Sequence, residues 1–251
     1  MIARLAQSRR ITARDTLYEF DCPELARKAA PGQFVELALG EGEGSFLRRP
    51  ISIFDCDGER RFFLLVRTVG RGTQTMTGWK PGREVDVLGP LGNGFSWPES
   101  AGVCVLVGGG IGLAPLTYLA RRLLETGWTV RLLFSPRRED ELLDALPQRE
   151  KLEIRCAENR TQLPVILEEM LAQADCVFAC GPEGMLETVA VKTMQRDIPC
   201  QLSMERHMAC GIGICLGCAI AVRTPEGLTY QKVCKDGPVF RAEEVSFHEQ
   251  P

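Results

Sequence analysis

Four cysteines in the last fifth of the chain have a spacing that suits metal chemistry. Cys210, Cys215 and Cys218 form a C-x4-C-x2-C segment, and Cys234 follows after a longer gap. This spacing is typical of plant-type [2Fe–2S] centres, in which soft thiolates hold the irons. Glycines among the cysteines allow the backbone to turn tightly around such a centre and leave amides free to point at sulfide. The segment therefore predicts a carrier of single electrons.

Two other uses of cysteine fit this segment less well. Zinc sites usually pair their cysteines in two short knuckles, whereas here the first gap is longer and the loop is rich in glycine. A disulfide framework is typical of secreted chains, and residues 1–10 have no long apolar core of a signal peptide. The other cysteines are scattered singly, and we expect most of them to be buried as small apolar side chains in a reducing compartment: Cys22, Cys56, Cys104, Cys156, Cys176, Cys180 and Cys200.

Two turns in the second part of the chain suit a nucleotide. Residues 108–112 are rich in glycine and stand between an apolar run and a helical pattern, where a pyrophosphate could approach the backbone. The turn is not a Walker loop, because no Gly-Lys-Ser/Thr follows it, and it is not a clean Rossmann fingerprint, because Leu113 replaces the third glycine. One such turn could serve packing alone. Two on one sheet favour a nucleotide site made of Gly108, Gly109, Gly110 and Gly112 with Cys180, Gly181 and Pro182.

Two cationic segments in the first hundred residues could hold phosphate. Arg49 and Ser52 lie close together in a segment that Pro50 helps to keep extended. Residues 66–73 add Arg67 and two glycines after a predicted strand. The first segment could equally be an edge strand with surface arginines. Together the two segments could hold a flavin nucleotide.

The elements around these motifs change in style along the chain. Short strands separated by Gly and Pro predict a small antiparallel β-barrel, with strands at residues 8–20, 34–39, 50–55, 61–67 and 85–88. Beyond Pro98, apolar strands alternate with helical patterns, which predicts a parallel α/β domain. Its helices are expected at residues 113–126, 163–172 and 183–196. We therefore expect three units: a flavin-binding barrel at residues 1–98, a nucleotide-binding α/β domain at 99–199 and a cluster-binding subdomain at 200–251.

Composition narrows the class of protein. The net charge is −3, which gives no indication of nucleic-acid binding. The longest apolar runs, such as residues 103–107, are too short to span a bilayer. The chain is therefore expected to be a soluble cytoplasmic protein.

These motifs together resemble the ferredoxin–NADP reductase-like flavoproteins and, more closely, the electron-transfer subunits of type B dihydroorotate dehydrogenases. The likeness extends along essentially the whole chain, and its most specific part is the cysteine segment with its closing residues 233–240. The other matching segments are residues 47–53, 88–94, 107–116, 180–182 and 208–213.

The resemblance implies a set of cofactors and a partner. It implies NAD(H) at the two glycine turns and a [2Fe–2S] centre on the four cysteines. Hydride transfer to flavin needs no side-chain acid or base, so no catalytic residue is assigned. The resemblance also implies a catalytic subunit that carries FMN and oxidises dihydroorotate, in a heterotetramer of two subunits of each kind. Electrons are then expected to pass from FMN through the cluster and FAD to NAD. The residues implied for FAD are Arg49, Pro50, Ile51, Ser52, Val66, Arg67, Thr68, Gly72 and Thr73.

Three questions stay open at the level of sequence. Ser135, Arg137 and Arg138 follow a strand at a place that often decides between nicotinamide cofactors. These residues could bind the 2′-phosphate of NADP. The arginines could instead be solvated loop charges paired with nearby acids, and on this interpretation NAD is the expected cofactor. A reductase subunit that passes NAD(P)H electrons to ferredoxin or another acceptor is the alternative function, and a zinc-stapled binding module is a more distant one. No specific role is evident for His207, which we expect to be an exposed interface residue.

Overall fold

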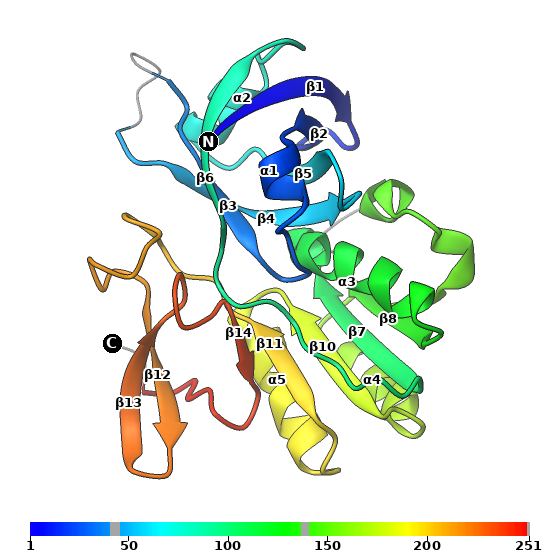
Figure 1. The fold of residues 1–251 in the computed structure, drawn as a ribbon. Helices are drawn as coiled ribbons and strands as arrows, with labels where there is room; N and C mark the ends of the chain where they lie inside the picture. Colours follow the sequence, from blue (N-terminus) through cyan, green and yellow to red (C-terminus); the bar gives the residue numbers. More distant parts are fainter. Residues whose placement is uncertain (41–45, 137–140, 250–251) are drawn as a thin grey trace.

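The computed structural model describes residues 1–40, 46–136 and 141–249. Within these residues the chain forms a closed barrel, a six-stranded mostly parallel sheet and a two-stranded hairpin (Figure 1). The predicted fold class is thereby confirmed. No helix in the described part of the chain is long and apolar enough to cross a membrane.

The barrel is closed by six antiparallel strands in the order β1-β2-β5-β4-β3-β6. Alternating side chains fill its interior, where the rings of Phe20 and Phe62 stack at 5.2 Å between centroids. Two short helices, α1 (Pro23–Ala26) and α2 (Arg71–Met76), connect strands. The strands are β1 (Ile2–Arg10), β2 (Asp15–Asp21), β3 (Phe34–Leu37), β4 (Arg49–Cys56), β5 (Arg61–Arg67) and β6 (Glu84–Leu91).

One predicted strand, at residues 8–20, is wrong. The chain reverses at residues 11–14, so this stretch contains the end of β1 and most of β2. The Thr12 hydroxyl donates a hydrogen bond of 2.6 Å to the Asp15 carboxylate and accepts one of 3.0 Å from the Asp15 amide. These local bonds stabilise the turn, and side chains of this kind compete with extended structure.

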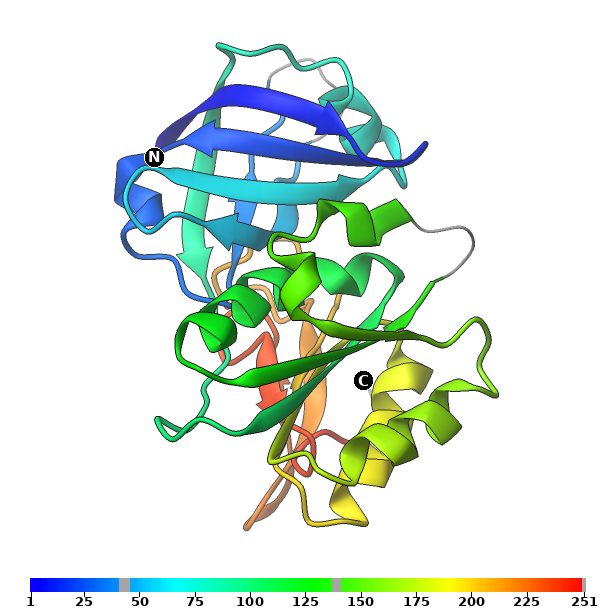
Figure 2. The ribbon, with the colours of Figure 1, turned by 90° about the vertical axis from the view of Figure 1, so that its right-hand side faces the viewer.

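The second sheet has the strand order β14-β11-β10-β7-β8-β9, and only its edge strand β14 is antiparallel. Helix α3 (Leu113–Glu125) covers one face, whereas α4 (Leu163–Leu171) and α5 (Glu183–Met194) cover the other. Figure 2 shows the barrel placed against one end of this domain. The short 3-10 helices are η1 (Gly110–Gly112), η2 (Glu141–Ala145) and η3 (Arg149–Lys151). The strands are β7 (Val103–Gly109), β8 (Thr129–Ser135), β9 (Glu153–Cys156), β10 (Cys176–Cys180), β11 (Cys200–Ser203) and β14 (Val239–Arg241).

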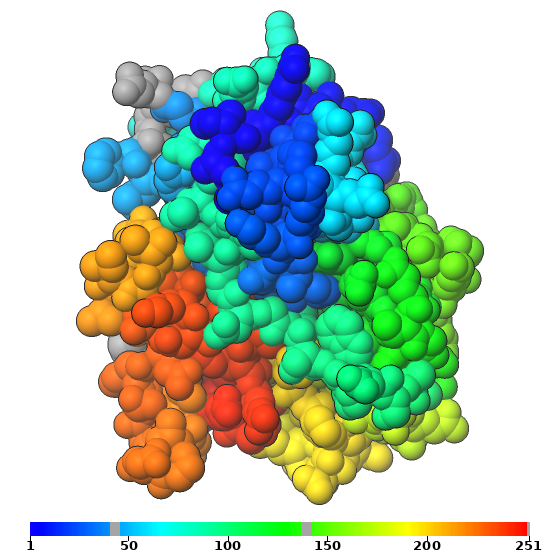
Figure 3. All heavy atoms as spheres, in the orientation of Figure 1, coloured from blue at the N-terminus to red at the C-terminus, as the bar shows by residue number. Residues whose placement is uncertain are grey.

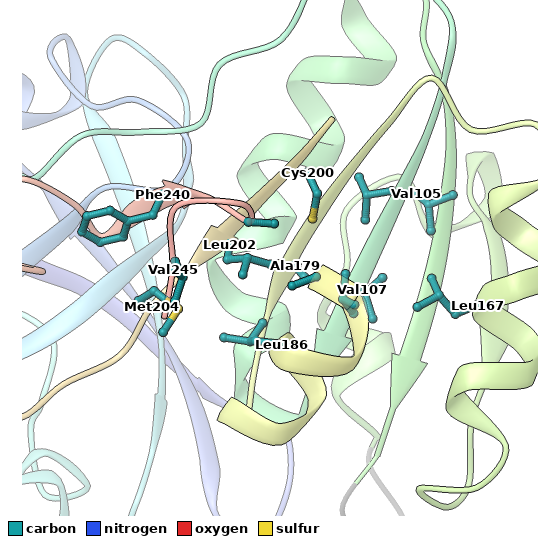
Figure 4. Packing of buried hydrophobic residues seen from close by; sticks show 14 of the residues in the cluster. Val105, Val107, Leu167, Ala179, Leu186, Cys200, Leu202, Met204, Phe240 and Val245 are labelled. Atoms are coloured by element: carbon teal, nitrogen blue, oxygen red, sulfur yellow. The ribbon is translucent and has the colours of Figure 1, made fainter. Parts of the chain in front are cut away.

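The apolar core of the second sheet explains most of the scattered cysteines. Figure 4 shows Val105 and Val107 of β7 beside Ala179 and Leu202, with Cys200 in the same layer. Burial raises the pKa of the Cys176 and Cys200 thiols to about 12, so they stay neutral and unreactive. Cys22, Cys56, Cys104 and Cys180 are also buried, as expected, and Cys156 is exposed.

The C-terminal residues join the sheet to the barrel. After β11 the chain forms the cysteine loop and then the hairpin of β12 (Ala219–Thr224) and β13 (Gly227–Lys232), before β14 returns to the sheet. Asn93, just after β6, donates a hydrogen bond of 2.9 Å to the carbonyl of Asp236. Figure 1 shows the cysteine loop beside the barrel end that carries β3 and β6. Residues 200–203 and 239–241 thus belong to the same sheet as β7, although the expected division places them in the third unit.

Candidate functional site

A cavity of about 370 Å³ lies between the barrel and the second sheet. Seven of the residues assigned to FAD from the sequence line it: Arg49, Pro50, Ile51, Ser52, Val66, Arg67 and Thr73. Thr68 and Gly72 are not among its lining residues. Gly72 instead packs beneath Arg49, where an added methyl group would lie 2.3 Å from Nε of that arginine.

Arg67 is held in place by a buried carboxylate. Its Nε and Nη2 donate to the two oxygens of Asp15 at 2.7 and 2.9 Å, which is the bidentate geometry that guanidinium groups favour. Asp15 is only 1% exposed. The Arg67 side chain also reaches the nucleotide turn, where Nη1 would lie 3.3 Å from a methyl group added at Gly110. Arg67 therefore reaches from strand β5 of the barrel to the glycine turn of the second domain.

The loop before α2 is shaped by Thr73. Its hydroxyl accepts hydrogen bonds from the amides of Val69 at 2.9 Å and Gly70 at 3.2 Å. These bonds fold residues 69–73 over the edge of the first cavity, which both Val69 and Thr73 line.

The same cavity has a wall that the motifs did not reveal. Ser203, Met204, Glu205, Arg206 and Met208 line it from the segment between β11 and the cysteine loop. Arg206 donates a hydrogen bond of 2.8 Å to Glu183 of α5. The available signal in the sequence was position: this segment directly precedes Cys210, the first cysteine of the loop. His207 is exposed and is not among the residues that line the cavity.

A second cavity, of about 600 Å³, lies at the carboxyl ends of the parallel strands. Gly109, Gly110 and Pro182 line it, so both predicted turns contribute. Gly108, Gly112, Cys180 and Gly181 are not among its lining residues. They set the packing of the two turns, since a methyl group added at Gly112 would lie 2.3 Å from the carbonyl oxygen of Cys180.

The loop after β9 is a third contributor to the second cavity that the motifs missed. Glu158, Asn159 and Arg160 line it together with Ser135 at the end of β8. Ligands of open α/β sheets bind beyond the carboxyl ends of the strands. Because β9 is parallel to β8 and lies next to it, the loop that follows β9 reaches the same edge of the sheet. Arg137 and Arg138 lie outside the described residues.

The four cysteines occur as two pairs of different exposure. The amide of Cys215 donates to Sγ of Cys210 at 3.5 Å, and the amide of Cys234 donates to Sγ of Cys218 at the same distance. Cys218 and Cys234 are both 2% exposed, whereas Cys215 is exposed and Cys210 half-buried. Within the described part of the chain, no group of three or more His, Cys, Asp or Glu side chains is arranged to hold a single ion. A [2Fe–2S] cluster has two irons, each held by two thiolates, and the two cysteine pairs suit this requirement.

The backbone of the cysteine loop favours a thiolate at Cys210. Hydrogen bonds from the amides of Cys215, Ile212 and Ile214 lower the pKa of Cys210 to about 6. Gly211 and Gly213 have φ values of 66° and 83°, which lets successive amides turn toward sulfur. In the other pair, burial and the neighbouring Cys218 raise the pKa of Cys234 to about 12. Sulfur ligands, directed amides and paired spacing together fit an iron–sulfur cluster.

The cysteine loop and the first cavity share residues. Met208 lines the cavity two positions before Cys210, and Pro238 lines it four positions after Cys234. Glu36 of β3 lies beneath the loop; burial raises its pKa to about 7, Arg48 and Arg49 oppose that shift, and Cys210 adds to it. Any redox group held by the cysteines would therefore adjoin any group held in the cavity.

Comparison with known proteins decides the family. Residues 205–246 match the iron–sulfur cluster binding domain of dihydroorotate dehydrogenase B. The chain is 38% identical over 251 residues to the dihydroorotate dehydrogenase B (NAD(+)) electron transfer subunit of Caldanaerobacter subterraneus subsp. tengcongensis, covering 98% of each chain. The chain belongs to this family of electron transfer subunits. The member from Desulforamulus reducens is 33% identical, over 94% of each chain.

Solved structures agree with this electron-transfer family in fold. The structure of the NADH-dependent reduced ferredoxin-NADP oxidoreductase has a TM-score of 0.85 and 26% identity, covering 100% of this chain and 91% of that chain. Phthalate dioxygenase reductase shares the fold with a TM-score of 0.63 and 21% identity, covering 94% of this chain and 77% of that one. The predicted resemblance is thus confirmed, and the subunit is part of an oxidoreductase with a ferredoxin reductase-like fold.

Proposed function

We propose that this subunit carries electrons between the FMN of a dihydroorotate dehydrogenase catalytic subunit and NAD, by way of a [2Fe–2S] cluster and FAD, in de novo pyrimidine biosynthesis. One observation carries the proposal. Met208 and Pro238, which flank the cysteines, line the same cavity as the barrel residues Arg49, Ser52 and Arg67. A cluster and a flavin bound at these places would be neighbours.

The first cavity fits FAD in the chemistry of its walls. Arg49, Ser52 and Arg67 offer donors for phosphates, and Asp15 keeps the Arg67 guanidinium in a fixed orientation. Pro50, Ile51 and Val66 supply apolar surface for a ring system, and we retain Thr68 and Gly72 as supporting residues of the same segments. When bound, FAD would supply the exchange of single electrons with iron and of hydride with nicotinamide. The protein's part is to bind and orient, so no side chain is assigned as a catalytic acid or base.

The cysteine loop would hold the cluster. We assign Cys210 with Cys215, and Cys218 with Cys234, as the two ligand pairs, on the basis of the amide contacts within each pair. The amides of Ile212 and Ile214 stabilise negative charge at sulfur.

The second cavity would bind NAD(H). Gly109 and Gly110 let the backbone approach a pyrophosphate at the start of η1 and α3, and Pro182 closes the opposite side. Gly108, Gly112, Cys180 and Gly181 would act by holding the two turns together. NAD rather than NADP follows the family, and Glu158 beside Ser135 offers a carboxylate for a ribose hydroxyl.

We also propose the arrangement of domains and subunits. Residues 1–98, 99–199 and 200–251 would form the FAD, NAD and cluster parts, with β11 and β14 of the third part completing the sheet of the second. Two such subunits would join two catalytic subunits. The buried thiols of Cys104, Cys176 and Cys200 suit a reducing, cytoplasmic location.

The catalytic subunit would dock on the surface around Cys215. Five exposed apolar residues, three from the cysteine loop and two from the segment just before β4, form what we call the cluster face: Ile212, Ile214 and Leu216 with Phe46 and Leu47. Figure 3 shows residues just after position 45, in light blue, and the orange cysteine loop on one side of the molecule. Exposed apolar patches mark interaction sites, and electrons cross only where the cluster lies close to the partner.

The proposed function is tested on the complex purified anaerobically from its own host. We expect dihydroorotate to drive NAD reduction, followed by absorbance at the nicotinamide band. Cys218→Ser should abolish this transfer while FAD stays bound, because Cys218 lies in the cluster loop and is not among the residues that line the flavin cavity. Cys156→Ser, an exposed cysteine outside the loop, is the matched control and should transfer at the wild-type rate.

Equal NAD reduction in the Cys218→Ser complex would contradict the proposed route. A second function is favoured by the likeness over the whole chain to the ferredoxin-NADP oxidoreductase structure. In that case the purified protein would oxidise NADH or NADPH with ferredoxin as acceptor and would not respond to dihydroorotate.

A further inference from the structure

Glu36 is a carboxyl group buried between the barrel and the cysteine loop. On β3 its neighbours Val35 and Leu37 point into the barrel and are fully buried, so Glu36 points outward. An outward side chain of a barrel is normally solvated. Glu36 is nevertheless only 1% exposed, because the cysteine loop covers it.

The covering residue is Gly211, next to Cys210. A methyl group added at Gly211 would lie 2.5 Å from Oε1 and 2.7 Å from Cγ of Glu36, so the loop backbone rests directly on the carboxyl group. Gly211 also has a φ of 66°, which favours glycine. Figure 1 shows the two elements side by side, β3 in blue and the loop in orange.

Neither carboxyl oxygen of Glu36 has a hydrogen-bond partner within the described residues. The nearby Arg48 donates to the Glu36 backbone carbonyl and to Asp86, and Arg49 donates to the carbonyls of Leu47 and Arg48. Burying a carboxyl group without hydrogen bonds costs folding free energy. Because Glu36 is destabilising in this position and lies beside a proposed cluster ligand, we looked for a function of its carboxyl group at the cluster.

Glu36 also adjoins both of the segments to which redox groups are assigned. In the barrel it pairs with Pro50 of β4, in the segment assigned to FAD, and through Gly211 it touches the loop assigned to the cluster. A negative charge near a metal centre disfavours the addition of an electron, and low dielectric strengthens the effect.

We propose that the carboxyl group of Glu36 lowers the reduction potential of a cluster held by the adjoining cysteine loop. The inference rests on the cluster of the proposed function. Glu36→Gln keeps the size and shape of the side chain and removes its capacity for negative charge. Because burial raises the pKa of Glu36 to about 7, the cluster midpoint is measured at pH 8.5 by EPR-monitored redox titration of the complex. It should shift to a more positive value in the variant, with the FAD midpoint moving less. Glu84→Gln, an exposed residue of the same barrel, is the matched control and should leave the cluster midpoint unchanged.

The outcomes separate this inference from the proposed function. A wild-type complex without the EPR signal of a [2Fe–2S] centre overturns the proposed function. A Glu36→Gln complex with wild-type iron content and an unmoved midpoint overturns only the role of Glu36. The proposed role of Glu36 is also overturned if the Glu36→Gln complex contains less iron while the clusters that remain keep the wild-type midpoint. In that case Glu36 serves only to fold the loop.

Discussion

Arg121 of α3 donates a hydrogen bond of 2.9 Å from Nε to Oδ1 of Asp55, near the end of β4. The bond crosses the boundary between the barrel and the second sheet, and Arg121 also donates to the carbonyl of Cys56. Both side chains of the pair are largely buried, at 17% and 16% exposure. Because the first cavity lies along this boundary, the pair helps to set the spacing of its two walls.

Arg121→Leu should reduce the free energy of unfolding by about 2–3 kcal/mol, because Asp55 stays buried without its cation. Burial raises the pKa of Asp55, and Arg121 opposes that rise. Without Arg121 the folded state binds a proton at Asp55 more tightly than the unfolded state does. The destabilisation should therefore grow as pH rises through the raised pKa and shrink at lower pH. Urea unfolding at pH 5 and pH 8 measures both effects.

The control for this variant is the next residue of the same helix. Arg122 is 46% exposed and pairs with Glu125 at 3.3 Å. Its replacement by Leu should change the free energy of unfolding by no more than about 0.5 kcal/mol at either pH. Similar losses for the two variants would show that Asp55 does not depend on Arg121.

Gly112→Ala should separate the two nucleotide turns. The φ of Gly112 is −60°, so backbone strain is not the cause. The added methyl group would instead meet the carbonyl oxygen of Cys180 at 2.3 Å, and overpacking of this kind costs about 1–3 kcal/mol. Thermal unfolding measures the loss of stability, and a titration with NADH should show weaker binding. Gly184→Ala is the control, because a methyl group there meets nothing within 4 Å and stability should hold or rise.

Asp15→Asn should weaken the binding of FAD by about tenfold or more, because Arg67 loses a charge-assisted bidentate partner. FAD fluorescence on titration of the flavin-depleted protein gives the dissociation constant, and circular dichroism verifies folding. Asp21→Asn, at the other end of β2, removes the partner of the exposed Arg60 and should bind FAD as the wild type does. An unchanged dissociation constant for FAD in Asp15→Asn would show that Arg67 does not take part in binding FAD.

Ile214→Glu should weaken association with the catalytic subunit. Ile214 is 76% exposed and belongs to the cluster face, where a buried charge without a partner opposes docking. Size-exclusion chromatography of the two subunits should show a smaller fraction of complex. Leu228→Glu, an exposed apolar residue of β13, is the control and should assemble normally. Equal assembly of the two variants would place the interface elsewhere.

Local pattern predicted most of the fold. The helix expected at residues 113–126 is α3 (Leu113–Glu125), and the one at residues 163–172 is α4 (Leu163–Leu171). Helical periodicity and the glycines at element ends carry this information within a few neighbouring residues. The error at residues 8–20 arose because one hydroxyl–carboxylate contact, between Thr12 and Asp15, ends β1 in a stretch without glycine or proline.

The candidate site was less accessible from the sequence. Cysteine spacing predicted the iron–sulfur domain that residues 205–246 match, because the four cysteines are close together in the chain. Glu36 and Glu205 carry no motif, since each meets its surroundings only when segments more than a hundred residues apart fold together. Glu158 was missed for the same reason: the loop after β9 reaches the nucleotide turns through the order of strands in the sheet.

The unequal exposure of the cysteine pairs has a consequence for how a cluster on them would fail. Cys215 faces solvent, while Cys218 and Cys234 are sealed in the core. A cluster held by these cysteines would be open to oxygen and chelators on the side of Cys215 and protected on the side of Cys218 and Cys234. A catalytic subunit docked over the outer pair would then act as a shield, and the lone subunit should bleach faster in air than the assembled enzyme.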